Sequence, residues 1–559
     1  MDVNVRVAGE AGQGVQTTGD LLVHVFASMG LHVFSSQSYM SRIRGGLNWY
    51  DIRASDAELF SGREKADLLV ALIPDAVEAL RDDVTPNGMI LLDGEKGNGA
   101  TPLPFTKTAQ DLTQSALMAN SVAAGAVFAV LGYDVQTLCD YLGVQFKKKG
   151  EEVVRNNVRC AQRGAKLVST AGGAGALKSP AGRGAPAPVY SGAEAVGLAA
   201  AVSGVKFVAS YPMTPSTGVF TYLAGVADDY GILVEQAEDE IAAVNMICGA
   251  TYAGVPAMTT TSGGGFALMV EGLALAGMME LPILILLSQR PGPATGLPTR
   301  TAQQDLRFAL HAGHGEFPRA MFAPGTPQQA YAITRRALET AHKFQTPVIL
   351  FLDQYLADLQ KNMPKLDATT RPIDRHIVKN PSPDYVRYAV TESGVSPRAI
   401  PGSGALVVCD SDEHTADGHI TEDLNVRVKQ QDKRMRKLKG MLAEALAPER
   451  YGPGDAQTVL VAWGSTYGPC REAVDLLNAN GGSAAIVHFA QVWPLDPAVV
   501  RSALGAEQVG RRFISVEGNA TGQFASILRE IGAVGECELL LRYDGMPFTG
   551  EEIAERAKQ

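Results

Sequence analysis

The residues whose types and spacing could perform chemistry gather between positions 204 and 305. Short apolar runs in this stretch are followed or preceded by polar or glycine-rich clusters, which are Tyr-Pro-Met-Thr-Pro-Ser at 211–216, Glu-Asp-Glu-Ile-Ala-Ala at 238–243, Thr-Ser-Gly-Gly-Gly at 261–265 and Ser-Gln-Arg-Pro at 288–291. Such runs are typical of buried parallel strands, whose carboxyl ends open onto a ligand crevice. We therefore expect the four clusters to converge on a cofactor site.

Two of these clusters restrict or free the backbone where a ligand would lie. Pro212 and Pro215 flank Thr214, and each proline fixes its own φ and limits the residue before it. We expect Thr214 to present its hydroxyl from a stiff turn. The glycines at 263–265 have no side chains, so the backbone there can approach a bound ring or substrate closely.

The acidic trio at 238–240 stands at the start of an alanine-rich stretch that we expect to be helical. Negative charge at a helix N-terminus is stabilising by about 0.3–1 kcal/mol, which is sufficient reason for Glu238 and Asp239. Glu240 has small apolar neighbours that could admit a ring. We expect its side chain to face the same crevice as Thr214 and Gly263.

Taken together and in this order, the four clusters resemble those of the α subunit of 2-oxoacid:ferredoxin oxidoreductases. The form that the chain resembles has a γ domain fused at its N-terminus, as in 2-oxoglutarate:ferredoxin oxidoreductase. The resemblance covers nearly the whole chain. It implies an α/β fold with three α/β domains: an N-terminal γ domain, a thiamine-diphosphate pyrimidine-binding domain and a C-terminal transketolase-like domain.

Composition and periodicity agree with this organisation, because a chain of 559 residues is too long for one core. Helical spacing is found at 192–202, 328–344 and 497–504, and apolar runs predict strands at 205–208, 257–261 and 281–287. We divide the chain into 1–168 (γ domain), 169–189 (a Gly/Ala/Pro-rich linker), 190–360 (pyrimidine-binding domain), 361–455 (an irregular connecting segment) and 456–559 (transketolase C-terminal-like domain).

The resemblance also implies roles for individual residues. A carboxyl that hydrogen-bonds N1′ of the aminopyrimidine of thiamine diphosphate works best with a raised pKa in an apolar pocket, and Glu240 matches the activating glutamate. Thr214 and Arg290 match the residues that bind the substrate carboxylate, and Arg300 is a candidate for the distal carboxylate of 2-oxoglutarate. The cofactor-binding residues implied in this domain are Pro212, Glu240, Ser262 and Gly263.

The N-terminal stretch contains a second glycine-rich turn, Gly-Glu-Ala-Gly-Gln-Gly-Val at 9–15, between a predicted strand and a predicted helix. Gly12 and Gly14 could bind a phosphate at the helix N-terminus, or could serve only close helix–strand packing. The spacing is Gly-x-x-Gly-x-Gly, and the next strand, at 31–34, is followed by no acidic residue for a ribose diol. A dinucleotide site is therefore disfavoured.

The loop Tyr-Met-Ser-Arg-Ile-Arg-Gly-Gly at 39–46 resembles the γ-domain loop of the family. Arg42 and Arg44 would project the same way from an extended loop. Such a pair suits an anionic group such as a coenzyme A phosphate, although solvated surface arginines are the alternative without the resemblance.

The chain lacks a Gly-Asp-Gly that could hold the diphosphate and its Mg²⁺, and it lacks closely spaced cysteines. The resemblance therefore implies a β subunit that supplies the Mg²⁺ site and a [4Fe–4S] cluster. It further implies ferredoxin as electron acceptor, coenzyme A as co-substrate and a dimer of γα–β heterodimers. The reaction would convert 2-oxoglutarate and coenzyme A reversibly to succinyl-CoA and CO2 with reduction of ferredoxin.

Charge and targeting features limit the other partners. A net charge of −10 argues against nucleic acid or an anionic membrane, and we expect a cytoplasmic protein because no signal peptide or membrane span is apparent. The six separated cysteines are expected to be reduced thiols. We expect no metal site, although His414, Asp417 and His419 could form one. The basic run at 429–439 is expected to be a solvated helix or a subunit contact.

Three alternatives remain open. The same scaffold could act on pyruvate, a branched-chain 2-oxoacid or an aryl pyruvate. The second alternative is a nucleotide-dependent dehydrogenase, which would bind NAD(H). The third is a noncatalytic scaffold, whose complex would keep full activity when Glu240 is replaced.

Overall fold

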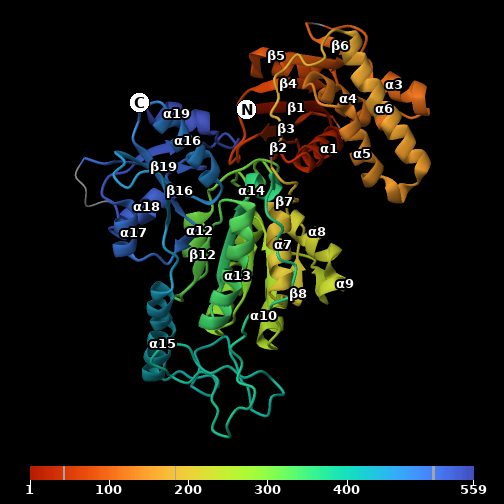
Figure 1. The fold of residues 1–559 in the computed structure, drawn as a ribbon. Coiled ribbons are helices and arrows are strands. Elements are labelled where there is room, and N and C mark those ends of the chain that lie inside the picture. Colours follow the sequence, from red (N-terminus) through yellow and green to blue (C-terminus); the bar gives the residue numbers. More distant parts are fainter. Residues whose placement is uncertain (42–44, 98, 183, 506–509, 559) are drawn as a thin grey trace. The chain divides into compact units, whose positions relative to one another are not determined.

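The computed structural model describes residues 1–41, 45–97, 99–182, 184–505 and 510–558, and these ranges form two compact units (Figure 1). The first unit comprises Met1–Tyr190 with Leu359–Lys365, and the second comprises Ser191–Asp358 with Leu366–Gln559. Among the described residues, no helix has the length and the apolar character needed to cross a bilayer.

The first unit is built on a mixed sheet. Its order is β6-β5-β4-β1-β3-β2-β14-β7, with bounds β1 (Asp2–Glu10), β2 (His32–Ser38), β3 (Leu47–Ser55), β4 (Ala66–Ala71), β5 (Val84–Asp93), β6 (Thr101–Leu103), β7 (Val189–Ser191) and β14 (Gln360–Asn362). The strand β1 pairs parallel with β4 and antiparallel with β3. The helices are α1 (Val15–Ser28), α2 (Pro74–Leu80), α3 (Phe105–Thr113), α4 (Ala119–Val130), α5 (Val135–Gln145) and α6 (Glu151–Thr170).

Two glycines allow α4 and α6 to pack with their backbones nearly in contact. A Cβ atom on Gly125 would lie 1.9 Å from the carbonyl oxygen of Ala161, and one on Gly164 would lie 1.9 Å from that of Val122. Any side chain at either position would separate the helices. A 3₁₀ turn at Ala116–Met118 directly precedes α4.

The second unit contains two sheets. The larger has the order β18-β12-β13-β11-β10-β8-β9 and comprises β8 (Phe207–Ser210), β9 (Leu233–Gln236), β10 (Ala257–Thr261), β11 (Leu284–Gln289), β12 (Ala320–Phe322), β13 (Val348–Asp353) and β18 (Gln491–Trp493). Its helices are α7 (Gly192–Val202), α8 (Thr217–Gly225), α9 (Ala227–Tyr230), α10 (Glu240–Tyr252), α11 (Gly263–Met278), α12 (Leu306–His311), α13 (Pro327–Phe344) and α14 (Gln354–Asp358). The helices α7 and α13 pack side by side (Figure 1).

The smaller sheet has the order β15-β17-β16-β19-β20. Its strands are β15 (Glu449–Tyr451), β16 (Thr458–Trp463), β17 (Ala484–Phe489), β19 (Arg512–Glu517) and β20 (Glu538–Leu541), with helices α16 (Tyr467–Ala479), α17 (Pro497–Leu504), α18 (Gln523–Glu530) and α19 (Gly550–Ala557). One apolar core joins the two sheets, because Trp463 of β16 stacks edge-on against Phe351 of β13. The strand β18 also pairs with β12 of the larger sheet.

The segment between the two sheets, residues 366–423, contains no helix or strand and leads into α15 (Leu424–Ala443) (Figure 1). We expected the basic run at 429–439 to be a solvated helix or a subunit contact, and neither description fits one face of α15, which is buried within the chain itself. Lys433 and Lys437 are fully buried and pair with Glu280 at 2.6 and 2.5 Å. Burial alone would raise the pKa of Glu280, but Lys437, Lys433 and Arg387 outweigh it, and the pKa is held well below its usual range.

This buried cluster attaches α15 to the end of α11, and it predicts a large loss of stability when its central charge is removed. Glu280→Gln leaves two buried ammonium groups without a counter-charge, and we expect it to lower the free energy of unfolding by about 3–5 kcal/mol. Urea unfolding followed by circular dichroism measures the change.

The matched control is Glu538→Gln, which removes a carboxylate from the exposed pair with Arg512 at 2.6 Å. Exposed ion pairs contribute little, so this variant should unfold close to the wild-type urea concentration. Equal effects of the two substitutions would contradict the structural role given to Glu280.

Candidate functional site

Three neighbouring parallel strands bring the predicted clusters together at one edge of the larger sheet. The strands β8, β10 and β11 are adjacent and parallel, and their carboxyl ends run into the turn at 211–216, into Ser262 and into Arg290. This edge of a parallel sheet is where ligands bind in open α/β folds. The helix α10 begins at Glu240 beside it.

Glu240 is the buried acid of this edge. Its side chain is only 3% exposed, and its Oε1 accepts no hydrogen bond from the described residues. A Cβ atom on Gly265 would lie 2.3 Å from this Oε1 and 2.3 Å from Oγ1 of Thr261. The carboxyl thus lies against the glycine-rich start of α11, where only glycine leaves room for it.

Burial raises the pKa of Glu240, and the nearby charge of Asp239 raises it further, against opposing effects of its own backbone N–H and of Arg290. A carboxyl in this environment holds its proton more readily than an exposed one. It can therefore donate a hydrogen bond to a ring nitrogen.

Thr214 and Arg290 are in direct contact, but through the threonine backbone. The guanidinium Nη1 of Arg290 donates to the carbonyl oxygen of Thr214 at 2.7 Å. Burial lowers the pKa of Arg290, and the negative charges of Asp305 and Glu240 oppose this effect. The structure therefore places Arg290 within the electrostatic reach of Glu240, at the 211–216 turn.

The remaining predicted residues of this unit differ in their surroundings. Ser262 is buried and its hydroxyl makes no hydrogen bond to any described residue, whereas Pro212 is exposed. Gly263 packs against the carboxyl of Asp305, since a Cβ atom there would lie 2.7 Å from Oδ2. Arg300 lies against the 544–546 loop, where its Nη1 is 3.6 Å from the sulfur of Met546. The assignment of Arg300 to a distal carboxylate stays a prediction.

The predicted phosphate-binding residues belong to the first unit. Gly12 and Gly14 have φ of 90° and 84°, and Gly14 is the N-cap of α1. A Cβ atom on Gly14 would lie 2.2 Å from the Oδ1 of Asn120, so close packing is one reason for this glycine. Arg42 and Arg44 lie outside the described residues.

Asp305 was not predicted as a site residue. It directly precedes α12, and its backbone N–H donates to Oε1 of Gln289 at 3.0 Å. Burial raises the pKa of Asp305 to about 6, against the opposing charge of Arg290. The only signal in the sequence was a polar triplet, Gln303-Gln304-Asp305, before a short apolar helix.

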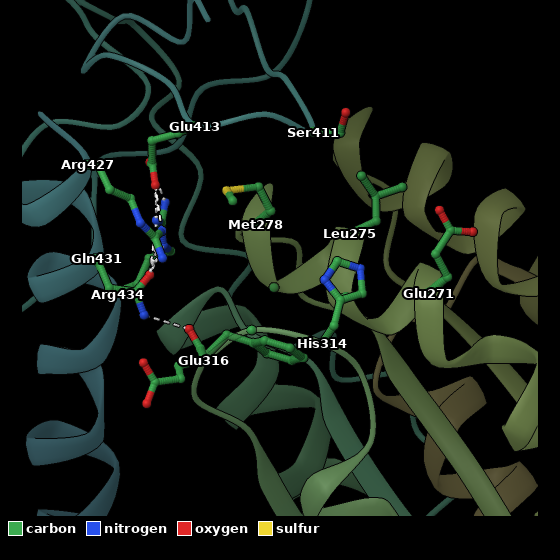
Figure 2. A pocket seen from close by; sticks show the side chains of 14 residues that line it. Glu271, Leu275, Met278, His314, Glu316, Ser411, Glu413, Arg427, Gln431 and Arg434 are labelled. Carbon is green, nitrogen blue, oxygen red and sulfur yellow. Dashed lines mark hydrogen bonds and ion pairs between the residues drawn. The ribbon is translucent and has the colours of Figure 1, made fainter. Parts of the chain in front are cut away.

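A cavity of about 490 Å³ opens elsewhere in the second unit, between the end of α11 and α15 (Figure 2). Three of its charged groups are paired with one another: Arg434 and Arg427 both contact Glu413, at 2.7 and 2.6 Å. None of the residues at the strand ends lines this cavity.

The possible metal site at 414–419 does not form. His414 is fully buried with its ring centroid 4.0 Å from that of Tyr388, while His419 is exposed beside Asp417. Over the described part of the chain, no group of three or more His, Cys, Asp or Glu residues could hold a metal ion.

The contact between Glu240 and Gly265 predicts a sharp difference between adjacent glycines. Gly265→Ala would place a methyl group against the buried carboxyl, so we expect a loss of about 1–3 kcal/mol from overpacking and a lower midpoint of thermal unfolding. Gly264→Ala is the matched control in the same turn of α11, because its Cβ atom meets nothing closer than 4.0 Å. Similar midpoints for both variants would show that Glu240 does not pack here.

Comparisons with known proteins agree with the geometry. The family model described as Pyruvate flavodoxin/ferredoxin oxidoreductase, thiamine diP-bdg, matches residues 199–433. The model described as Pyruvate ferredoxin/flavodoxin oxidoreductase matches residues 4–167, and the model for the transketolase C-terminal domain matches residues 452–537. The three models fall on the three sheets, and the predicted fold class is confirmed.

Relatives match along the whole chain. The 2-oxoacid:ferredoxin oxidoreductase 2, subunit alpha, of Aeropyrum pernix is 30% identical, over 100% of this chain and 98% of the relative. The 2-oxoglutarate oxidoreductase subunit KorA of Mycobacterium tuberculosis is 28% identical over 99% of this chain and 90% of the relative.

One solved structure matches over nearly its whole length. It is the 2-oxoglutarate:ferredoxin oxidoreductase from Magnetococcus marinus with 2-oxoglutarate, coenzyme A and succinyl-CoA bound, which is 32% identical, with a TM-score of 0.91 over 100% of this chain and 99% of that one. The buried acid at the strand ends, the three family models and these full-length relatives lead to one conclusion: the chain belongs to the 2-oxoacid:ferredoxin oxidoreductase family, as the alpha subunit.

Proposed function

We propose that the chain forms the pyrimidine-binding side of a thiamine diphosphate site in a 2-oxoglutarate:ferredoxin oxidoreductase. The complex would convert 2-oxoglutarate and coenzyme A to succinyl-CoA and CO2, and pass the electrons to ferredoxin. The observation that carries the proposal is the buried Glu240, whose Oε1 has no hydrogen-bond partner among the described residues and whose pKa is raised.

The residues at this edge fit the cofactor. The unpartnered Oε1 of Glu240 needs a polar partner that the described chain does not provide, because a buried polar atom left unpaired is costly. A protonated carboxyl is the donor that the N1′ of an aminopyrimidine requires. When bound, thiamine diphosphate would supply the carbanion chemistry that removes CO2 from a 2-oxoacid.

Arg290 and Thr214 would bind the carboxylate that the 2-oxoacid loses as CO2. The guanidinium of Arg290 has further N–H donors beyond the one given to Thr214, and a fork of donors suits a carboxylate. Arg300 would serve the distal carboxylate of a dicarboxylic substrate. The choice of 2-oxoglutarate is supported by Arg300, by the KorA relative and by the ligands of the Magnetococcus marinus structure.

A partner subunit would cover this site. The helices around Glu240 expose several large apolar side chains: Ile241 and Met246 of α10 are 46% and 40% exposed, and Leu268 of α11 is 50% exposed. Clustered exposed apolar side chains beside a functional site are typical of a protein interface. We propose a β subunit there, which would carry the diphosphate site, Mg²⁺ and a [4Fe–4S] cluster, in a dimer of γα–β heterodimers. Coenzyme A would bind near Gly12, Gly14, Arg42 and Arg44.

Replacing the buried acid tests the function directly. Glu240→Gln keeps the shape but cannot hold a transferable proton, so we expect at least a hundredfold loss of 2-oxoglutarate-dependent ferredoxin reduction by the purified complex. Because the pKa of Glu240 is raised in the folded state, the folded wild type keeps this proton at pH values where the unfolded chain has lost it. The free energy of unfolding of the wild type therefore falls as the pH rises above the ordinary pKa of a carboxyl. Glu240→Gln should therefore unfold at a higher temperature than the wild type at pH 8.

Full activity of Glu240→Gln would contradict the proposed site, and loss of both activity and stability would indicate a structural role. A panel of 2-oxoglutarate, pyruvate, branched-chain and aryl 2-oxoacids, assayed with the wild-type complex, tests the substrate. No reduction of ferredoxin with 2-oxoglutarate, together with turnover of another oxoacid, would replace 2-oxoglutarate in the proposal.

The face that carries the exposed side chains of Ile241, Met246 and Leu268 is where we expect the β subunit to bind. Leu268→Glu places a charge on that face, and we expect the variant to lose co-purification with the β subunit while it keeps its own thermal stability. The control is Val499→Glu, at a residue of similar exposure (43%) on α17 of the smaller sheet. Unchanged co-purification of the Leu268 variant would place the interface elsewhere.

A further inference from the structure

Asp305 is a second acid at the strand ends, and its carboxyl lies in a place that the chain defines tightly. Its backbone N–H is held by Gln289, and Nε2 of the preceding Gln304 donates to the carbonyl oxygen of Arg290 at 3.0 Å. Gln523 donates to the carbonyl oxygen of Gln304 at 2.6 Å. Asp305 therefore cannot move independently of the loop that carries Arg290.

The carboxyl is directed at the start of α11, and one of its oxygens lacks a hydrogen-bond partner among the described residues. Both of its oxygens lie within 2.8 Å of the position that a Cβ atom on Gly263 would occupy. Its Oδ2 is buried and makes no hydrogen bond within the described ranges. Glu240 stands in the same relation to Gly265, so two acids with unpartnered oxygens flank this glycine-rich turn.

Arg290 is the cation that both acids share. The negative charges of Asp305 and Glu240 both act on its guanidinium, and among the described residues it forms no ion pair within 4 Å with either. The remaining charge near Asp305 on its own helix is Arg307, which is held 2.8 Å from Glu530. Arg290 is therefore the charge that Asp305 faces across the site.

We propose that Asp305 controls substrate affinity as a positioning residue for Arg290: Arg290 accepts the carboxylate of a 2-oxoacid only when Asp305 is protonated and neutral. An ionised Asp305 would compete with the substrate carboxylate for the guanidinium of Arg290, and its negative charge would repel that carboxylate. The inference rests on the proposed role of Arg290. Above the pH at which Asp305 ionises, each substrate molecule that binds would therefore be accompanied by one proton, which Asp305 takes up.

The pH dependence follows with a definite sign. Burial raises the pKa of Asp305 to about 6, so above that pH the free site loses the proton that the bound site needs. The KM for the 2-oxoacid should rise with pH, approaching about tenfold per pH unit. The substrate carboxylates are ionised throughout this range and contribute no slope.

The test is the KM of the purified complex from pH 5.5 to 8, for the oxoacid that it oxidises best. The wild type should show the rise, and Asp305→Asn, which is neutral at every pH, should bind with a flat KM that is at least fivefold below the wild type at pH 8. Asp496→Asn is the matched control, because it removes one aspartate charge from the partly exposed N-cap of α17 and should keep the wild-type slope. A slope that persists in Asp305→Asn would overturn the proposal.

A second measurement needs no variant of Asp305. Titration calorimetry of the wild-type complex with an unreactive analogue, N-oxalylglycine for 2-oxoglutarate or oxamate for pyruvate, in two buffers of different ionisation enthalpy, should show close to one proton taken up at pH 8 and only a minor fraction of a proton at pH 5.5. No uptake at pH 8 would overturn the inference.

Arg290→Lys distinguishes a failure of the role proposed for Arg290 from a failure of the inference on Asp305. If the KM of this variant equals that of the wild type, the proposed role of Arg290 fails, and the inference fails with it. If the KM rises while Asp305→Asn keeps the wild-type slope, only the inference on Asp305 is wrong.

Discussion

The candidate site depends on the burial of one carboxyl against a backbone that has no side chains. Glu240 fits where it does because Gly265 leaves the space that any other residue would fill. The low polarity of that space raises the pKa of Glu240. The same turn receives Asp305 at Gly263, so the glycines determine the positions of two acids at once. The charge of Arg290 acts on both. Side chains in place of these glycines would push the carboxyls toward solvent, where their pKa values would no longer be raised by burial.

Much of the second unit serves to hold this edge of the sheet in place. The polar triplet that ends in Asp305 is fixed from the smaller sheet: Gln303 donates to the carbonyl oxygen of Trp463 at 2.7 Å and accepts from the backbone of Gly518. On the other side, the buried pairs of Glu280 with Lys433 and Lys437 attach α15 to the end of α11. A helix that carries the glycine turn at one end is thus anchored by buried charges at the other.

The two helices that begin at the site, α10 and α11, expose the large apolar side chains of Ile241, Met246 and Leu268. A complete thiamine diphosphate site needs groups for the diphosphate and its metal ion, and no suitable cluster of ligands exists among the described residues. Both observations agree with the proposal that a partner subunit completes the site. The cavity near Glu413 in Figure 2 has its own paired charges and takes no part in this arrangement.

The sequence by itself determined the family, the fold class and the elements with strong local signals. The helices α7 and α17 and the strand β10 have the predicted bounds, because periodicity and flanking residues are local properties. The order of four short clusters was enough to predict which strand ends would meet.

Only the tertiary structure decided how the side chains meet, since contacts between residues distant in the chain depend on packing that no local pattern encodes. It showed that Arg290 contacts the backbone of Thr214, that two lysines of a basic run are buried around Glu280, and that Asp305, which carries no motif, lies against Gly263. A charged residue in a sequence is expected to be exposed, because most charged residues are. Whether it is buried beside an opposite charge depends on contacts that exist only in the folded chain.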